Sequence, residues 1–287
     1  MQLHVGCAMW THTPWNGRFL PHPLPASERL EAYATWCNAV EGNTTFYATP
    51  ARATVEMWAA QVAPDFRFVL KLPKVITHDL RLHDAADVEL RAFLEAMRPL
   101  GSRAHALWIQ LPASFGPSEL GALAAFLRRA PAGFRYAVEV RHPAFFSDDR
   151  ATQQLEQVLG RVGAEWVPFD TVTLFATDAS SYGEREAWLN KPRLPRRTRA
   201  LTQYPIVRYI GRDDVEVTAA GWQYLADQTA LWLREGRSPT VFLHTPDNVE
   251  ALALARRFYD DVRARVPELV PPLPSPVAVP AEPPTLF

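Results

Sequence analysis

The chain has 287 residues and nearly balanced charge, with 30 lysine and arginine residues against 31 aspartate and glutamate residues. This balance excludes a strongly basic nucleic-acid coat protein and an acidic disordered chain, and a hydrophobic share of 48% is enough for a large core. Cys7 and Cys37 have no partners at zinc spacing, and no signal peptide or membrane-spanning run is visible, so we expect a soluble cytoplasmic protein without a disulfide framework.

Eight short segments have the composition of β-strands, being rich in β-branched and aromatic residues. They are residues 3–7, 39–41, 67–72, 106–111, 135–140, 165–169, 206–210 and 240–243. Between them lie longer segments in which apolar residues recur every three or four positions. That spacing predicts amphipathic helices over residues 26–37, 88–97, 119–129, 218–235 and 248–266.

This alternation of strands and helices predicts an α/β protein with a parallel sheet. Eight strand–helix units are typical of a TIM-type (β/α)8 barrel, and we predict such a closed barrel, with some irregular units, as one domain over residues 1–266. An open, doubly wound sheet would use the same alternation. It usually carries a glycine-rich first turn, however, and the sequence contains no Gly-x-Gly-x-x-Gly motif.

Two regions depart from the alternation. The long connection 171–204 has a centre, residues 191–199, with five positive charges and no negative one. We expect a solvated loop there, because its prolines prevent a regular helix; a lid over the site or a grip on a phosphate backbone is the alternative. The proline-rich segment 267–287 is predicted to be a disordered tail, and its terminal Leu286 and Phe287 faintly resemble a motif that docks on a partner protein.

Polar or aromatic side chains end or follow every predicted strand, and in a parallel barrel these strand ends meet at one rim. Glu139 is the first candidate for a general acid or base, followed by Glu41 and Asp170. The predicted substrate-binding residues are Trp10, Asn43, Thr45, Tyr47, Lys71, His78, Gln110, Arg141, Arg208 and His244. Several of these charged groups lie among apolar strand residues, so a structural network of ion pairs closing the rim is the competing interpretation.

A metal centre is a further alternative at the same rim. The histidines His78, His142 and His244 and the three carboxylates are acceptable metal ligands, yet the same strands carry arginine and lysine, which repel a cation. We therefore expect no cofactor and no metal, with a divalent cation as the less favoured alternative. Cys7 and Cys37 are expected in the core, and the sequence has no nucleophile elbow and no P-loop.

The strand-end motifs resemble those of the YecE-like family, which is domain-of-unknown-function family 72, over about residues 3–260. The most specific match is Glu41-Gly42-Asn43-Thr44-Thr45-Phe46-Tyr47. Further matches are residues 66–71 with Thr77-His78, 107–112, 139–143 and 207–209, whereas Cys7-Ala8-Met9, Ile210 and His244-Thr245 depart from the family pattern. The resemblance implies a barrel fold and a site at the strand ends, and it implies no particular activity.

Lys71, Arg141 and Arg208 suit a phosphate or carboxylate, and the aromatic residues suit a flat ring. We therefore predict an enzyme, either a hydrolase or an isomerase or lyase, that acts on a small anionic ligand such as a phosphorylated sugar, a nucleotide or a nucleic-acid end. A glycosidase is disfavoured, because three cations accompany the carboxylates. A non-catalytic protein that binds nucleic acid or a phosphate ligand is the alternative, and no membrane partner is expected.

Overall fold

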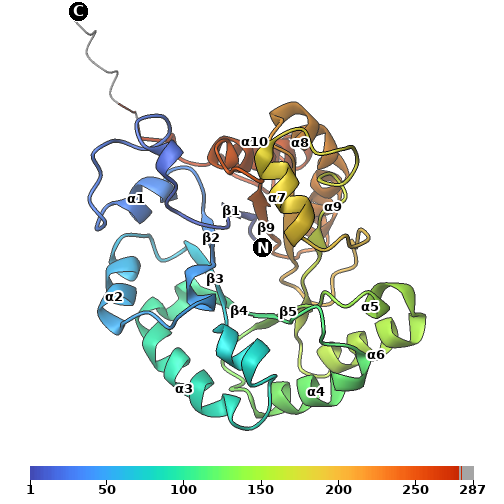
Figure 1. Ribbon diagram of the computed structural model, residues 1–287. Coiled ribbons are helices and arrows are strands. Elements are labelled where there is room, and N and C mark those ends of the chain that lie inside the picture. The colour runs from blue at the N-terminus through green and yellow to red at the C-terminus, as the bar shows by residue number, and fades with distance from the viewer. Residues whose placement is uncertain (278, 280–287) are drawn as a thin grey trace, which may run out of the picture.

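The strands of the sheet all run parallel, in the order β6-β5-β4-β3-β2-β1-β9-β8-β7. They are β1 (His4–Cys7), β2 (Ala39–Gly42), β3 (Arg67–Lys71), β4 (Ala104–Gln110), β5 (Tyr136–Glu139), β6 (Glu165–Trp166), β7 (Phe169–Asp170), β8 (Ile206–Ile210) and β9 (Thr240–His244). The computed structural model describes residues 1–277 and 279, and in it the sheet curls so that the helices cover its outer side (Figure 1).

The predicted closed barrel of eight strands is wrong, whereas the predicted α/β class with a parallel sheet is correct. The sheet has nine strands, and β6 and β7 form its two edges. Both edges come from the sixth predicted strand, because Glu165–Trp166 pairs with β5 and Phe169–Asp170 pairs with β8. Pro168 lies between them. Since proline has no amide hydrogen, the ladder breaks at this point, and the one predicted strand becomes two short ones.

Ten α-helices connect or flank the described strands. They are α1 (Arg29–Ala34), α2 (Arg52–Ala60), α3 (Ala86–Met97), α4 (Leu120–Arg129), α5 (Ala144–Ser147), α6 (Asp149–Gly160), α7 (Tyr182–Asn190), α8 (Val215–Gly221), α9 (Gln223–Arg234) and α10 (Ala251–Arg265). Side-chain caps start two helices that periodicity did not predict: Asp148 accepts hydrogen bonds from Arg150 and Ala151 at α6, and Ser181 accepts one from Glu184 at α7. No helix in the described part of the chain combines the length and apolar character needed to cross a membrane.

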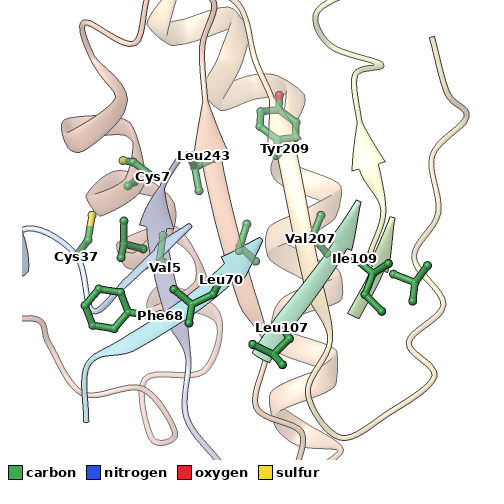
Figure 2. Packing of buried hydrophobic residues seen from close by; sticks show 14 of the residues in the cluster. Val5, Cys7, Cys37, Phe68, Leu70, Leu107, Ile109, Val207, Tyr209 and Leu243 are labelled. Atoms are coloured by element: carbon green, nitrogen blue, oxygen red, sulfur yellow. The ribbon is translucent and has the colours of Figure 1, made fainter. Parts of the chain in front are cut away.

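The two faces of the sheet bury different sets of apolar side chains. Alternate strand residues, among them Phe68, Leu70, Leu107 and Tyr209, point outward and pack with the helices (Figure 2). The intervening residues form a separate cluster on the inner face, made of strand residues and Val167 alone: Ala39, Val69, Ala106, Trp108, Ala137, Val167, Ile206 and Phe242. This two-residue alternation decides which polar side chains reach the inside of the curled sheet.

The segment after α10 lies along that helix. Val270 is buried, and the Tyr259 hydroxyl donates to the Pro271 carbonyl at 2.8 Å. Arg256 Nη1 donates to the Pro274 carbonyl at 2.7 Å. The division into a domain over 1–266 and a disordered tail stays a prediction, and the expected docking residues Leu286 and Phe287 lie outside the described residues.

Candidate functional site

The alternation of the strands brings six of the sequence-predicted site residues to one end of the inner face. Each stands two positions after an apolar residue of the inner cluster, at or near the carboxyl end of its strand. They are Glu41 after Ala39, Lys71 after Val69, Gln110 after Trp108, Glu139 after Ala137, Arg208 after Ile206 and His244 after Phe242. Ligands of open parallel sheets bind at the carboxyl ends of the strands, so this is the expected place for a site.

Glu41 is the centre of a buried ionic cluster. Its Oε1 atom lies 2.7 Å from Lys71 Nζ and 3.3 Å from Arg208 Nη1. Lys71 Nζ also donates to Gln110 Oε1 at 2.8 Å and lies 5.0 Å from the centre of the Trp108 ring. The predicted cluster of carboxylates and cations therefore exists as a set of direct contacts among β2, β3, β4 and β8.

A second ion pair adjoins this cluster. Arg141 Nε donates to Glu139 Oε1 at 2.5 Å, and the Glu139 side chain is fully buried. The Arg141 and Arg208 guanidinium groups lie 5.1 Å and 5.3 Å from the centre of the same ring, that of Phe169. The guanidinium groups of Arg208 in β8 and of Arg141, just after β5, therefore both lie beside Phe169 in the edge strand β7.

Several polar atoms at this end of the sheet are buried without a hydrogen-bond partner among the described residues. They are Glu41 Oε2, Glu139 Oε2, Arg208 Nε and His244 Nδ1. Burying a polar atom without a partner costs free energy, and nearly all buried polar groups in folded proteins avoid it. Other such atoms lie elsewhere in the described part of the chain, among them both ring nitrogens of His4 and Nε2 of His105 at the opposite ends of the strands.

The charges of the site act on one another. Burial raises the pKa of Glu41, but Arg208 and Lys71 oppose it and hold the net value below the ordinary range. Burial and the nearby Arg208 lower the pKa of Lys71 to about 8, against the opposing effect of Glu41. Burial and the charges of Lys191, Arg208 and Lys71 lower the pKa of His244, so this imidazole is neutral at pH 7.

A cavity of about 250 Å³ opens beside Glu41. Its lining includes three other predicted binding residues, Trp10, Asn43 and Tyr47, which follow β1 and β2. Tyr47 is 79% exposed, so its ring stands at the cavity mouth. The cavity therefore joins a buried carboxylate to the aromatic side chains of Trp10 and Tyr47.

Three predicted site residues take other positions. Thr45 Oγ1 lies 2.6 Å from the Lys71 carbonyl oxygen and 2.7 Å from that of Gly42, so its hydroxyl is engaged with the backbone. His78 is half-buried beside Thr77, 2.9 Å from its hydroxyl; burial and then Arg141 lower its pKa. Asp170 accepts a hydrogen bond from the Val172 amide at 2.9 Å and lies 3.7 Å from Arg196, so it faces the connection after β7 rather than Glu41.

The basic segment 191–199 contains five positively charged residues. Its four arginines contact residues outside the ionic cluster, and Lys191 lies near that cluster. Arg197 and Arg199 pair with Glu156, Arg196 lies 3.4 Å from the centre of the Tyr224 ring, and Arg193 stacks on Phe175 and Trp188. Lys191 instead lies near the ionic cluster. Burial and the charges of Arg208, Arg141 and Lys71 lower its pKa to about 7. Sequence reasoning noted this segment for its charge but did not select Lys191.

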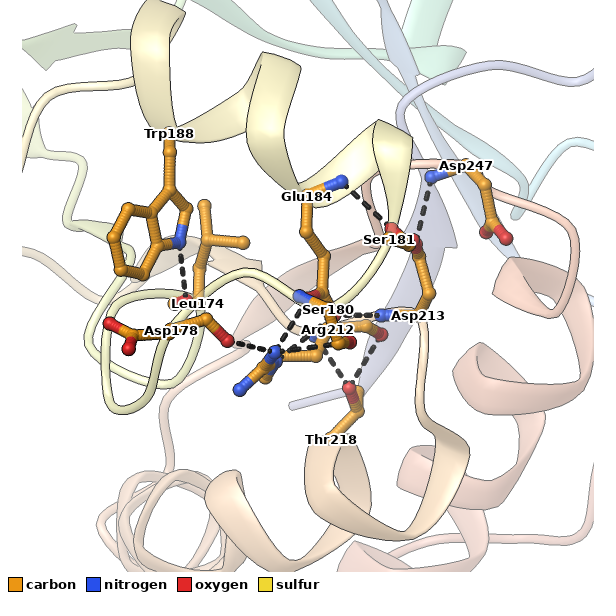
Figure 3. Close-up of polar contacts among 10 residues, drawn as sticks. All are labelled: Leu174, Asp178, Ser180, Ser181, Glu184, Trp188, Arg212, Asp213, Thr218 and Asp247. Atoms are coloured by element: carbon orange, nitrogen blue, oxygen red, sulfur yellow. Dashed lines mark hydrogen bonds and ion pairs between the residues drawn. The ribbon is translucent and has the colours of Figure 1, made fainter.

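A buried ion pair holds this connection in place. Arg212, just after β8, donates to both carboxylate oxygens of Glu184 in α7, at 3.0 Å and 2.5 Å (Figure 3). Ser180 donates to Glu184 Oε2 through its amide at 2.7 Å and its hydroxyl at 2.9 Å. Lys191 directly follows Asn190, the last residue of α7, so this pair fixes the helix that precedes Lys191.

A larger cavity, of about 630 Å³, lies at the opposite, amino-terminal ends of the strands. His4, Arg67, His105 and Arg135 line it, and both nitrogens of His4 and Nε2 of His105 have no hydrogen-bond partner in the described part of the chain. None of the sequence-predicted site residues lies there. No group of three or more His, Cys, Asp or Glu side chains within residues 1–277 and 279 is arranged to hold a metal ion.

Comparison with known proteins finds relatives that match nearly the whole chain. The chain is 36% identical over 274 residues to the UPF0759 protein YecE of Escherichia coli, strains O157:H7 and K12, covering 95% of this chain and 97% of each relative. A DUF72 family protein from Thermotoga maritima has the same fold, with a TM-score of 0.69 at 20% identity over 91% of this chain and 98% of that chain. One from Enterococcus faecalis gives a TM-score of 0.66 at 15% identity, over 93% and 96% of the two chains.

The family profile described as protein of unknown function DUF72 matches residues 4–278. This match covers the strand-end motifs that first pointed to the family, including the segment that begins at Glu41. The sequence-based assignment is therefore confirmed, and the chain belongs to the DUF72 family.

Proposed function

We propose that this protein is an enzyme acting on a small anionic substrate, a phosphorylated sugar or a nucleotide, at the carboxyl ends of the strands. The observation that carries the proposal is the charge of the cluster. Lys71, Arg141 and Arg208 outnumber the two paired carboxylates, Glu41 and Glu139, so the site keeps a positive charge before Lys191 is counted. A buried positive site attracts an anion strongly, because little water screens the interaction.

The arginines are the proposed anion clamp. A guanidinium presents several donors in a fixed fork that matches a phosphate or carboxylate. Arg208 uses Nη1 toward Glu41 and keeps Nε without a hydrogen-bond partner among the described residues, and Arg141 uses Nε toward Glu139. Lys71 is held by Glu41 and Gln110, so it supplies a fixed charge rather than a mobile one.

Glu139 is the proposed proton-transfer group. Arg141 fixes one of its oxygens at 2.5 Å, and the other, Oε2, is buried without a partner among the described residues. A carboxylate with one oxygen held and the other free has the geometry of a general base, or of a general acid once it is protonated. Such a proton-transfer group suits a hydrolase, an isomerase or a lyase. Glu41, whose Oε1 contacts both Lys71 and Arg208, is proposed to hold these two cations in place.

The alternative of a nucleic-acid grip has less support. Four arginines of the basic segment 191–199 are occupied by Glu156, by Tyr224 or by the aromatic rings of Phe175 and Trp188. A backbone-binding surface needs several free cations along a groove. If oligonucleotides bind at low salt and this binding survives loss of the clamp in Arg208→Met, the small-ligand proposal fails in favour of that alternative.

The test is to separate binding from turnover in Glu139→Gln. Candidate phosphorylated sugars and nucleotides are screened for turnover with the unmodified protein, and affinity is measured by calorimetry. We expect Glu139→Gln to lower turnover by at least about a hundredfold, the usual size of an acid–base effect, while affinity stays within a few fold. Glu186→Gln, an exposed residue of α7, is the matched control. If Glu139→Gln changes neither quantity, the site is assigned wrongly.

A further inference from the structure

Lysine is rare in this chain, and its distribution is informative. Only three of the 30 lysine and arginine residues are lysines: Lys71, Lys74 and Lys191. Lys71 belongs to the ionic cluster, the charge of Lys191 acts on Glu41 of that cluster, and Lys74 is exposed. Arginine cannot lose its charge in a protein, whereas a buried lysine shifts its pKa readily. This chain uses arginine almost everywhere, yet it places lysines in and beside the ionic cluster. A lysine amine can become neutral there, and a neutral amine can act as a nucleophile.

The backbone on both sides of Lys191 is fixed. The Lys191 amide donates to the Ala187 carbonyl at 2.8 Å, which closes the last turn of α7. The carbonyl of the next residue, Pro192, accepts a hydrogen bond from the Thr171 hydroxyl at 3.0 Å, just beyond β7. The Lys191 side chain is half-buried, and its charge interacts with those of Arg208, Arg141 and Glu41 in the site.

The two lysines of the site differ in what holds their amines. Lys71 Nζ lies between Glu41 Oε1 at 2.7 Å and Gln110 Oε1 at 2.8 Å and is almost fully buried. Within residues 1–277 and 279, the Lys191 amine has neither a hydrogen bond nor an ion pair. Lys71 is thus fixed as a charge, whereas the nitrogen of Lys191 is available for bond formation.

The groups around Lys191 favour its neutral form. Arg208 from β8, Arg141 after β5 and Lys71 from β3 each disfavour a further positive charge, and Glu41 from β2 opposes them. His244 from β9 is neutral and adds no charge. With a pKa of about 7, close to half of the Lys191 amines are unprotonated at neutral pH. Desolvation beside other cations is an established way to activate a lysine nucleophile.

We propose that Lys191 is a nucleophile that forms an imine with the carbonyl carbon of an anionic aldehyde or ketone held at this site. The inference rests on the proposed function, because Arg208 and Arg141 are to hold the anion of the same molecule. It narrows the substrate class to phosphorylated or carboxylated carbonyl compounds. An imine withdraws electrons from the adjacent carbon, which suits proton abstraction by a carboxylate such as Glu139.

The step balances without a redox partner. The amine lone pair bonds to the carbonyl carbon, and the π electrons of the C=O bond move to oxygen. That oxygen takes the proton which the nitrogen loses, giving a carbinolamine. The hydroxyl then accepts one proton from solvent and leaves as water, and the nitrogen lone pair completes the C=N bond of a protonated imine.

The experiment traps this imine with a defined probe. The full chain is incubated with glyceraldehyde 3-phosphate and sodium cyanoborohydride, which reduces the imine to a stable secondary amine. Peptide mass spectrometry then compares labelling of the three lysines and the amino terminus. We expect Lys191 to be labelled at least tenfold faster than Lys74, with a rate that rises with pH through about 7 as the neutral amine accumulates.

Two variants and a second ligand make the result decisive. Lys191→Arg keeps the charge and should lose the label at this position, and Lys74→Arg is the matched control that should keep it. Glycerol 3-phosphate, which has the same anion and no carbonyl, should bind in calorimetry and slow the labelling, and Arg141→Met should weaken both effects. Glycerol 3-phosphate binding with no label on Lys191, or with equal label on Lys74, overturns the imine proposal alone. Absence of glycerol 3-phosphate binding overturns the proposed function itself and this inference with it.

Discussion

Lys71 Nζ lies 2.7 Å from Glu41 Oε1, and the exposed fractions of the two side chains are 2% and 0%. The pair joins neighbouring strands, because Glu41 is opposite Val69 in the register of β2 and β3. Both residues follow an inner-face apolar residue by two positions, so folding of the strands alone brings the charges together. A buried pair of this kind adds little net stability, but removal of one partner leaves an uncompensated buried charge.

The first prediction compares the loss of Glu41, which has two cationic partners, with the loss of Lys71. Glu41→Gln leaves two cations, Lys71 and Arg208, without their carboxylate, and we expect it to lower the free energy of unfolding by about 3–5 kcal/mol. Lys71→Met should cost less, because Arg208 still pairs with Glu41. Urea denaturation of both variants measures the difference, and the exposed Lys74→Met should stay within about 0.5 kcal/mol of the unmodified protein. A larger loss in Lys71→Met than in Glu41→Gln would contradict this arrangement.

The second prediction concerns the pair that fixes α7. Without Arg212, Glu184 loses both guanidinium contacts, and α7 loses the ion pair that ties it to the segment just after β8. We expect Arg212→Met to raise amide hydrogen exchange in α7 by at least tenfold while β1 to β5 stay protected. Arg185→Met, on the exposed side of α7, is the control and should leave exchange unchanged. Uniformly faster exchange over the whole chain would show a global effect instead of a local anchor.

The third prediction is an acid dependence of stability. Burial opposes ionisation of Glu184, but Arg212 and the Ser180 donors outweigh it and lower the pKa from the ordinary 4.5 to about 2. The folded state therefore binds this proton less readily than the unfolded chain. Its contribution is present above pH 4.5 and is lost as the pH falls from 4.5 toward 2. We expect about 2–3 kcal/mol from this group, and Glu184→Gln should flatten that part of the profile in urea titrations from pH 6 to pH 3.

The strand ends could be predicted from the sequence because the alternation of strand residues is local information. Lys71 after Phe68-Val69-Leu70 and Glu139 between two valines were visible as charges within apolar runs, and the structure brings both to the inner face. The closed barrel was the wrong inference, because the effect of Pro168 depends on which neighbours the strand pairs with. The residue pattern of the segment 165–169 looks like that of one continuous strand, so the pattern alone does not show the break at Pro168.

Residues in the connections were harder to predict. Asp170 ends its strand as expected, but the chain turns at once, and its carboxylate accepts from Val172 beside Arg196. Charge counting placed Lys191 in a solvated basic loop, whereas the pair of Glu184 with Arg212 directs it to the site over a long sequence separation. The one signal for it in the sequence was the rarity of lysine beside so many arginines.

The fourth prediction separates the two substrate classes. Tyr47 stands at the mouth of the cavity beside Trp10, and 79% of it is exposed, so Tyr47→Ser should change stability by less than about 0.5 kcal/mol. If the substrate is a nucleotide, loss of base stacking should weaken AMP binding by about tenfold and leave ribose 5-phosphate binding unchanged. Tyr182→Ser, another exposed tyrosine, is the control. If calorimetry finds that Tyr47→Ser does not weaken AMP binding, the aromatic side chains at the cavity mouth are not part of the binding site.

The last prediction concerns the pH dependence of anion binding. The pKa of Lys191 is about 7, so its positive charge is present below that pH and disappears above it. Sulfate keeps its own charge between pH 6 and 7.5, and burial lowers the pKa of His244 well below its ordinary value, so most of a change in sulfate affinity over this range reports on Lys191. We expect affinity to fall about three- to fourfold from pH 6 to pH 7.5, in proportion to the protonated fraction. Lys191→Arg keeps its charge and should show only the fall of less than about 1.5-fold that Lys71, with a pKa of about 8, contributes, whereas an unchanged slope in that variant would assign the titration to another group.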